Sequence, residues 1–249
     1  MVEGWLSDAM ANYNRESYEK RQAYAGQLHL PGHLFQDLIW WALQALPDEI
    51  LVGLEIDSNK ANLDEVEQMF AGEDQRSNLF AGQGYLVSEA KLVNRGDSFS
   101  VHHLPEEWTD GMFANQRGSR GGRFTHWLHT HPNAPAIPSE ADADAAQETI
   151  GVDLILGLRF SPEGFLPWFD DVEGQTRSLT NNEEEQTKQP RKRSWFARNK
   201  LPVLGIAPSG HRIHDIQLIA FHKTGLGINV VLVDEDGLPF GWPELNGKQ

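Results

Sequence analysis

The 249-residue sequence contains no cysteine. This absence excludes disulfides, thiolate zinc sites and a cysteine nucleophile, and leaves histidines and carboxylates as the strong metal ligands. Positive charge is also scarce, with 21 Lys and Arg against 36 Asp and Glu and a formal net charge of −15. Because an acidic surface repels phosphate backbones, we expect partners that are proteins or small molecules, and a nucleic-acid contact would need a local basic patch.

Long apolar runs are missing as well. No stretch approaches the roughly 20 apolar residues that a membrane span needs, and residues 1–8 lack the basic region and apolar run of a signal peptide. We therefore expect a cytoplasmic protein with no membrane partner. The chain is 39% apolar, with eight Trp and twelve Phe, so it can fill the core of one large domain.

The clearest secondary-structure signal is an apolar face at helical spacing in residues 33–46. Pro47-Asp48 ends this helix, and Glu49 opens an apolar stretch at 49–54 that predicts a buried strand. A further helix is expected at 139–150, and further strands at 84–93, 124–131, 153–160, 165–169, 213–222 and 227–233, the last two closing the sheet.

The pattern predicts an α/β protein in four parts. These are an N-terminal helical extension (1–26), a catalytic core (27–173), a polar linker or insertion (174–204) and C-terminal strands that complete the core domain (205–249). Residues 94–123 read as a long loop, which is typical of functional segments. The basic and aromatic stretch 191–198 is interpreted as part of a linker whose Trp and Phe anchor it to the domain; the alternative is a segment that binds nucleic acid or an acidic partner.

One constellation carries chemistry: His129-Thr130-His131-Pro132 is followed by Ser139 and Asp142, in the pattern H-x-H-x7-S-x-x-D. Residues two apart on a strand point to the same side, so His129 and His131 can present imidazoles to one ion. Asp142, in the first turn of the next helix, would supply a third ligand. Three protein ligands leave the fourth tetrahedral position open to water, as in catalytic zinc sites.

Two further residues complete a hydrolytic site in this interpretation. Glu49, at the corner between the first helix and the first strand, is the candidate base that accepts a proton from the attacking water and passes it to the leaving amine. The Ser139 hydroxyl can donate to the oxyanion of the tetrahedral intermediate. Zn²⁺ is the metal that the ligand types favour, although iron or cobalt also fit histidine and carboxylate sites.

A simpler interpretation exists for each half of the motif. Ser139-x-x-Asp142 is also a capping-box start for a helix, and His-x-His can be two unrelated surface residues. We favour the metal site because the four positions rarely coincide by chance. Other polar residues near or after the motif are interpreted as ordinary strand, surface or solvated helix positions: His102, His103, His126, His211, His214, His222, Asp144 and Glu148.

The motif resembles the signature of the JAMM/MPN+ (JAB-domain) zinc metalloproteases, an upstream Glu followed by H-[S/T]-H-P-x6-S-x-x-D. The match is complete at His129, Thr130, His131, Pro132, Ser139 and Asp142. Family members place the catalytic Glu after the first helix, at the start of the first strand, which Glu49 resembles; Glu55, at the far end of that strand, is the rival acid. The resemblance covers roughly residues 27–173 and, more loosely, 205–236.

The resemblance implies an MPN domain, a curved mixed β-sheet flanked by helices with a cytidine-deaminase-like layout. It also implies a zinc-dependent isopeptidase or peptidase that cleaves after the C-terminus of ubiquitin, a ubiquitin-like protein or a small sulfur-carrier protein. The N-terminal extension, the 94–123 segment and the 174–204 insertion depart from the family pattern, and they leave the substrate and the oligomeric state open. The alternatives are a catalytically silent MPN-type scaffold and a small-molecule zinc amidohydrolase.

Overall fold

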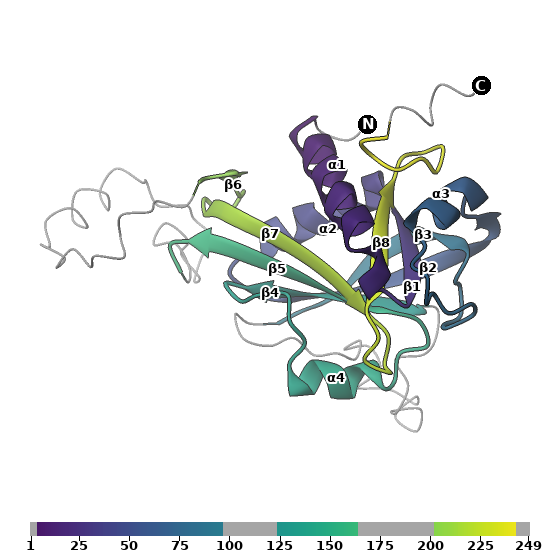
Figure 1. Ribbon diagram of the computed structural model, residues 1–249. Helices are drawn as coiled ribbons and strands as arrows, with labels where there is room; N and C mark the ends of the chain where they lie inside the picture. Colours follow the sequence, from purple (N-terminus) through teal and green to yellow (C-terminus); the bar gives the residue numbers. More distant parts are fainter. Residues whose placement is uncertain (1–3, 97–123, 164–201, 243–249) are drawn as a thin grey trace, which may run out of the picture.

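A curled, mixed β-sheet that forms half of a barrel lies at the centre of the molecule, with helices on both sides (Figure 1). The computed structural model describes residues 4–96, 124–163 and 202–242. The six strands of this sheet are ordered β3-β2-β4-β5-β7-β6, and β4 and β5 are its one parallel pair. Their bounds are β2 (Ile50–Ala61), β3 (Tyr85–Arg95), β4 (His126–Pro132), β5 (Asp153–Ser161), β6 (Gly205–Ile206) and β7 (Arg212–Phe221).

One face of the sheet carries the main hydrophobic core. Alternate residues of β5, Leu154, Leu156 and Leu158, are fully buried there, as the period-two geometry of a strand requires. Helix α2 (Gly32–Ala45) covers this face with the apolar stripe that its sequence predicts, and Leu38 and Ala42 are among its buried residues. The helix expected at residues 33–46 is therefore confirmed.

The opposite face of the sheet is covered by the short helix α4 (Glu140–Ala146), on the other side from α2 in Figure 1. Ala146 of this helix packs with Ile155 of β5 and Phe221 of β7 in a small apolar cluster. A second small cluster contains Leu51 and Trp127, from β2 and β4. On the same face, β4 presents His129 and His131.

The last strand does not close the large sheet, so that prediction is wrong. β8 (Ile228–Val233) pairs in parallel with β1 (Gly26–Pro31), a strand that the sequence did not predict, and the two form a separate sheet. All six residues of β8 are buried, which is typical of a parallel strand that is covered on both faces. The preceding strand, β7, does lie in the six-stranded sheet as expected.

Helix α1 (Gly4–Glu19) packs against the core and β8. Leu6 and Met10 are buried in the main core. The Asn14 side chain donates to the Leu232 carbonyl (2.8 Å) and accepts from the Leu232 amide (2.9 Å), and Ser17 donates to a further carbonyl of β8 (3.1 Å). The stretch read from the sequence as a polar extension is thus fixed to the domain by buried hydrogen bonds.

The remaining expectations differ in their bounds. β2 runs to Ala61 rather than residue 54, and α4 ends at Ala146 rather than residue 150. The α-helix α3 (Asp64–Phe70) and the 3₁₀ turn η1 (Arg21–Ala23) were not predicted. The strand expected at 165–169 lies outside the described residues. Within the described ranges, no helix combines the length and apolar character needed to cross a bilayer.

Candidate metal centre

Strand β4 places His129 and His131 on the face of the sheet that α4 covers. They are two residues apart, so their side chains leave the strand on the same side. β4 is a central strand, with β2 on one side and β5 on the other, and His129 pairs with Leu51 and Ile155 in the two registers. The His129 side chain is buried and that of His131 is 12% exposed.

Helix α4 brings Asp142 to the two imidazoles through a capping box. The Ser139 hydroxyl accepts a hydrogen bond from the Asp142 amide (3.2 Å), and Asp142 Oδ2 accepts one from the Ser139 amide (2.7 Å). The capping interpretation of this pair is therefore correct, and it coexists with the placement of Asp142 beside the histidines. The cap fixes the carboxylate at the start of the helix, where negative charge is favourable.

The three side chains converge on one point. His129 Nε2 lies 3.0 Å from His131 Nε2 and 3.0 Å from Asp142 Oδ1, and His131 Nε2 lies 3.4 Å from Asp142 Oδ2. Ligand atoms about 2.0–2.1 Å from a tetrahedral ion lie roughly 3.3–3.4 Å from one another. The spacing of these atoms is close to that value, so this buried His-His-Asp group can hold a metal ion.

The electrostatics of the metal-free group agree with this geometry. Partial burial alone would raise the pKa of Asp142, but hydrogen bonds from His129 and His131 outweigh it and hold that pKa well below its usual range. Burial alone would lower the pKa of His131, but the contacts with Asp142 and the charge of Glu49 raise it instead. The carboxylate is therefore ionised at neutral pH, as a metal ligand must be.

The loop between β4 and α4 is held down by two residues that the sequence interpretation missed. A Cβ at Gly157 of β5 would lie 2.8 Å from the Ala136 amide nitrogen, so glycine is needed for the loop to cross the strand closely. The Gln217 side chain accepts from that same amide (3.2 Å). His131 Nδ1 contacts the Pro135 carbonyl in this loop (3.0 Å), which directs Nε2 toward the metal position.

Glu49 immediately precedes β2 and is buried, with 8% of its surface exposed. β2 and β4 are antiparallel, and their pairing ends with Leu51 opposite His129. Glu49, two residues before Leu51, therefore lies beyond this pair, toward the end of β4 that carries His131. The contribution of the Glu49 charge to the pKa of His131 is consistent with this proximity.

The corner that carries Glu49 is fixed from two sides. The Ile50 amide donates to Thr130 Oγ1 (3.0 Å), which joins the start of β2 to the strand that carries both histidines. Arg95 forms an ion pair with Asp48 (2.9 Å) and donates to the Ala45 carbonyl (3.1 Å), which ties the end of α2 to β3. Neither contact was predicted, because both join residues at least 47 positions apart.

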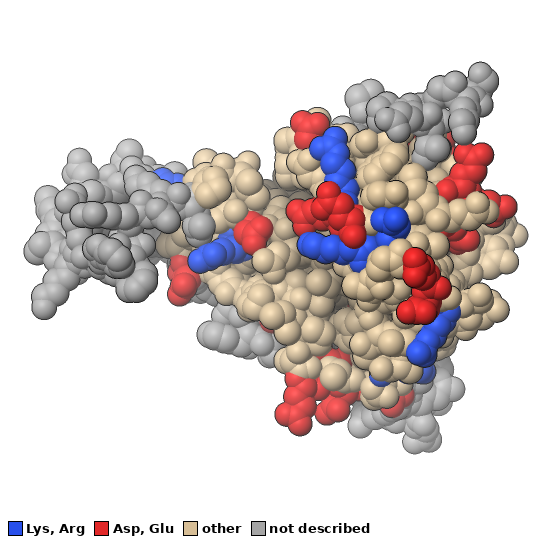
Figure 2. Space-filling model, in the orientation of Figure 1, with Lys and Arg blue, Asp and Glu red and all other residues tan. Residues whose placement is uncertain are grey.

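Other candidates from the sequence lie elsewhere. His126 is on β4 but faces the opposite side of the sheet, where its ring contacts Phe80, and Glu55 lies on β2 six residues beyond Glu49. Asp144 and Glu148 are exposed, as expected of a solvated helix face, and carboxylates gather around α4 in Figure 2. His211 contacts Ser209, His214 contacts Ser161 and His222 contacts Thr224, and His102 and His103 lie outside the described residues.

Comparison with known proteins gives no assignment: no protein-family model matches the chain, and no curated protein matches it either. The motif and the geometry of the His-His-Asp group therefore carry any functional conclusion.

Proposed function

We propose that this protein is a zinc-dependent hydrolase of the JAMM/MPN+ type, acting on the isopeptide or peptide bond that follows the C-terminus of a ubiquitin-like or sulfur-carrier protein. The observation that carries the proposal is the convergence of three ligand atoms, from His129, His131 and Asp142, beside the buried carboxylate of Glu49. A half-barrel mixed sheet flanked by helices is the architecture that an MPN domain requires.

In this proposal His129, His131 and Asp142 hold Zn²⁺, which when bound supplies Lewis-acid activation of water at neutral pH. The Glu49 carboxylate takes a proton from the attacking water as the oxygen of that water bonds to the acyl carbon. The same carboxyl group then protonates the leaving amine nitrogen as the C–N bond breaks.

Ser139 has a separate role in the proposal. Its oxygen accepts from the Asp142 amide, so the hydroxyl hydrogen can be donated to the oxyanion that forms on the acyl oxygen. Ser139 is exposed at the edge of the site, where an extended substrate tail can reach it. The choice of ubiquitin-like or sulfur-carrier tails rests on the family resemblance of the motif.

The decisive experiment measures metal content and cleavage of a panel of ubiquitin-like and sulfur-carrier fusions by the parent chain, Glu49→Gln and Glu55→Gln. Glu49→Gln should keep one equivalent of zinc and lose about 10²–10⁴-fold in cleavage, the usual value of a general base. Glu55→Gln changes the same residue type six residues further along the chain, on β2 and away from the histidines, and should behave as the parent.

Each other outcome has a defined meaning. A folded parent chain that takes up no zinc would contradict the hydrolase and favour the silent scaffold. Stoichiometric zinc together with cleavage of small amides and none of the fusions would favour the amidohydrolase. Equal losses in both glutamine variants would remove Glu49 from its proposed role.

A further inference from the structure

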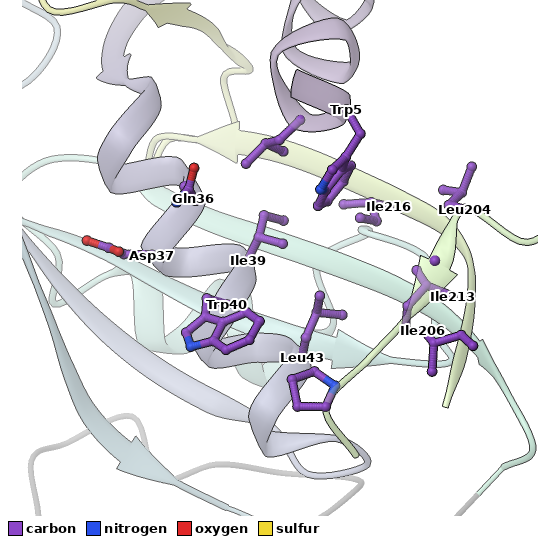
Figure 3. Close-up of a pocket in the computed structure, with 13 residues that line it drawn as sticks. Trp5, Gln36, Asp37, Ile39, Trp40, Leu43, Leu204, Ile206, Ile213 and Ile216 are labelled. Atoms are coloured by element: carbon purple, nitrogen blue, oxygen red, sulfur yellow. The ribbon is translucent and has the colours of Figure 1, made fainter. Parts of the chain in front are cut away.

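An apolar groove of about 510 Å³ opens between α1, α2 and the β6–β7 edge of the sheet, on the side away from α4 (Figure 3). Core residues such as Leu6, Ile39 and Ile213 line it from below. Trp5, Trp40, Leu204 and Ile206 also line it, and their side chains belong to α1, α2 and the β6 segment. The floor of the groove is therefore part of the main core, and its rim is formed by exposed residues.

Exposed apolar side chains concentrate at this groove. Ten large hydrophobic residues are exposed in the described part of the chain, and four of them line the groove: Trp5 (48%), Trp40 (49%), Leu204 (57%) and Ile206 (72%). Val203, which directly precedes Leu204, is also exposed (51%). A contiguous apolar patch of this kind on a soluble protein is typical of a surface that another segment or partner covers.

The edge of the sheet at the groove is also exposed. β6 is only two residues long and ends the strand order beside β7. Within the described residues it has β7 on one side and no strand on the other. Both residues of β6 are exposed, and an exposed sheet edge is a place where an extended segment can add.

The chain itself supplies a candidate occupant close by. Residues 164–201 lie outside the described residues, and the chain resumes at Pro202, directly before the residues that line the groove. The stretch 191–197 reads Arg-Lys-Arg-Ser-Trp-Phe-Ala, two large aromatic residues preceded by three basic ones. Leu204 follows Phe196 by eight positions, and eight residue steps can span roughly 26–29 Å when extended, enough to turn back into the groove.

Charge also matches between the two. Asp37 is the only charged residue among the thirteen that line the groove, and it is exposed on α2. The basic run 191–193 is complementary to it, in a chain with 36 acidic and 21 basic residues. Aromatic side chains for the apolar lining and basic side chains for the Asp37 rim are therefore present in one heptapeptide.

We propose that residues 191–197 dock into this groove, with Trp195 and Phe196 against its apolar lining and the basic run beside Asp37. The docked segment covers Trp5, Trp40 and Ile206 and holds the polar insertion beside β6. The groove and the metal centre lie on opposite faces of the sheet. Docking is therefore independent of the proposed hydrolase activity and can be tested without a substrate.

The test uses the absence of cysteine from the parent chain. Gln36→Cys in the groove lining and Ala197→Cys beside the two aromatic residues are introduced together, and the rate of cross-linking by a short bismaleimide is measured at low protein concentration. The matched control carries the same two cysteines with Trp195→Ala and Phe196→Ala. The chain length between the cysteines is then identical, and only the proposed contacts differ.

The expected result is a cross-linked monomer that forms at least about tenfold more slowly in the control, because burial of two aromatic side chains is lost. Equal rates would mean that chain proximity alone produces the cross-link and would overturn the proposal. Covalent dimers that increase with protein concentration would assign the groove to a second copy instead. Circular dichroism of all variants establishes that they are folded in the same way.

Discussion

The two faces of β4 each carry a histidine, but the two histidines have different surroundings. His126 faces the main core, where it is fully buried beside Phe80 and burial lowers its pKa to about 3. His129, three residues later, faces α4 and lies 3.0 Å from Asp142. One imidazole is packed as a neutral core side chain and the other sits in a converging ligand set. The partner on the facing element, rather than the histidine itself, decides which.

The largest expected effect separates these two histidines directly. His129→Ala removes one of three ligands and should abolish zinc retention and, if the proposed function is correct, reduce cleavage by roughly 10³-fold or more. His126→Leu should keep one zinc per chain, because its side chain faces the other layer. Metal analysis of both purified variants checks this, and loss of zinc from His126→Leu would contradict the separation of the two faces.

A smaller effect is expected where β5 supports the metal face. Gly157→Ala places a methyl group against the Ala136 backbone, so the loop that leads to Asp142 must move. We expect zinc affinity to fall by about 10–100-fold, as for other contacts that orient metal ligands. Gly205→Ala is the matched control, because a Cβ there meets nothing within 4 Å. A competition titration with a chelator measures both, and unchanged affinity in Gly157→Ala would contradict the role of the close crossing.

Acid should destabilise the protein through its core face. Burial lowers the pKa of His126 and of His29 to about 3, so below pH 6.5 the unfolded chain binds protons that the folded chain does not. Stability then falls as the pH decreases, by about 2 kcal/mol at pH 5 for each residue. Urea unfolding at pH 7 and pH 5 measures the loss. His126→Leu should reduce it by about 2 kcal/mol, and an unchanged loss would contradict the assignment.

The metal face predicts the opposite sign in the metal-free protein. The pKa of His131 is raised in the folded state, so its stabilising contribution is present below the unfolded pKa of about 6.5 and is lost as the pH rises through the folded value. Removal of zinc should therefore reveal a loss of stability as the pH rises above about 6.5. Asp142→Asn should abolish that loss, since the carboxylate is the partner of the imidazolium.

The smallest effect concerns the hydrogen bond from the Ile50 amide to Thr130, which joins β2 to β4. Thr130→Val removes the acceptor of the buried Ile50 amide and should cost about 1–2 kcal/mol of unfolding free energy. Zinc content should stay the same, while cleavage falls severalfold because Glu49 directly precedes Ile50 and shifts when that hydrogen bond is lost. Thr130→Ser keeps the hydroxyl and should restore both properties. An equal cleavage loss in the serine variant would exclude the hydrogen bond as the cause.

The sequence predicted those parts of the fold that are governed by local pattern. The apolar stripe of α2 and the apolar run of β5 match the structure closely, as do the positions of the motif residues on β4 and α4. Identification of the ligand set from spacing was possible because strand period and helix start both act over a few residues.

The missed parts depend on distant partners. β1 contains the buried polar residues Gln27 and His29, which hydrogen-bond to each other (3.1 Å) and conceal the strand from an apolar pattern. The inner face of α1 includes Asn14 and Ser17, so its stripe was too weak to show that it docks. Glycine is needed at position 157 only because the loop after β4 lies directly over it. Such contacts require the tertiary structure.

The parallel pairing of β1 with β8 has a consequence for biosynthesis. Gly26 and Ile228 are neighbours in the register. β1 is therefore synthesised about 200 residues before β8, the strand with which it pairs. At about 5–20 residues per second, this interval lasts on the order of 10–40 s. Until β8 emerges, Asn14 and Ser17 lack their carbonyl partners on that strand, so β1 and α1 cannot adopt their native pairing during most of synthesis.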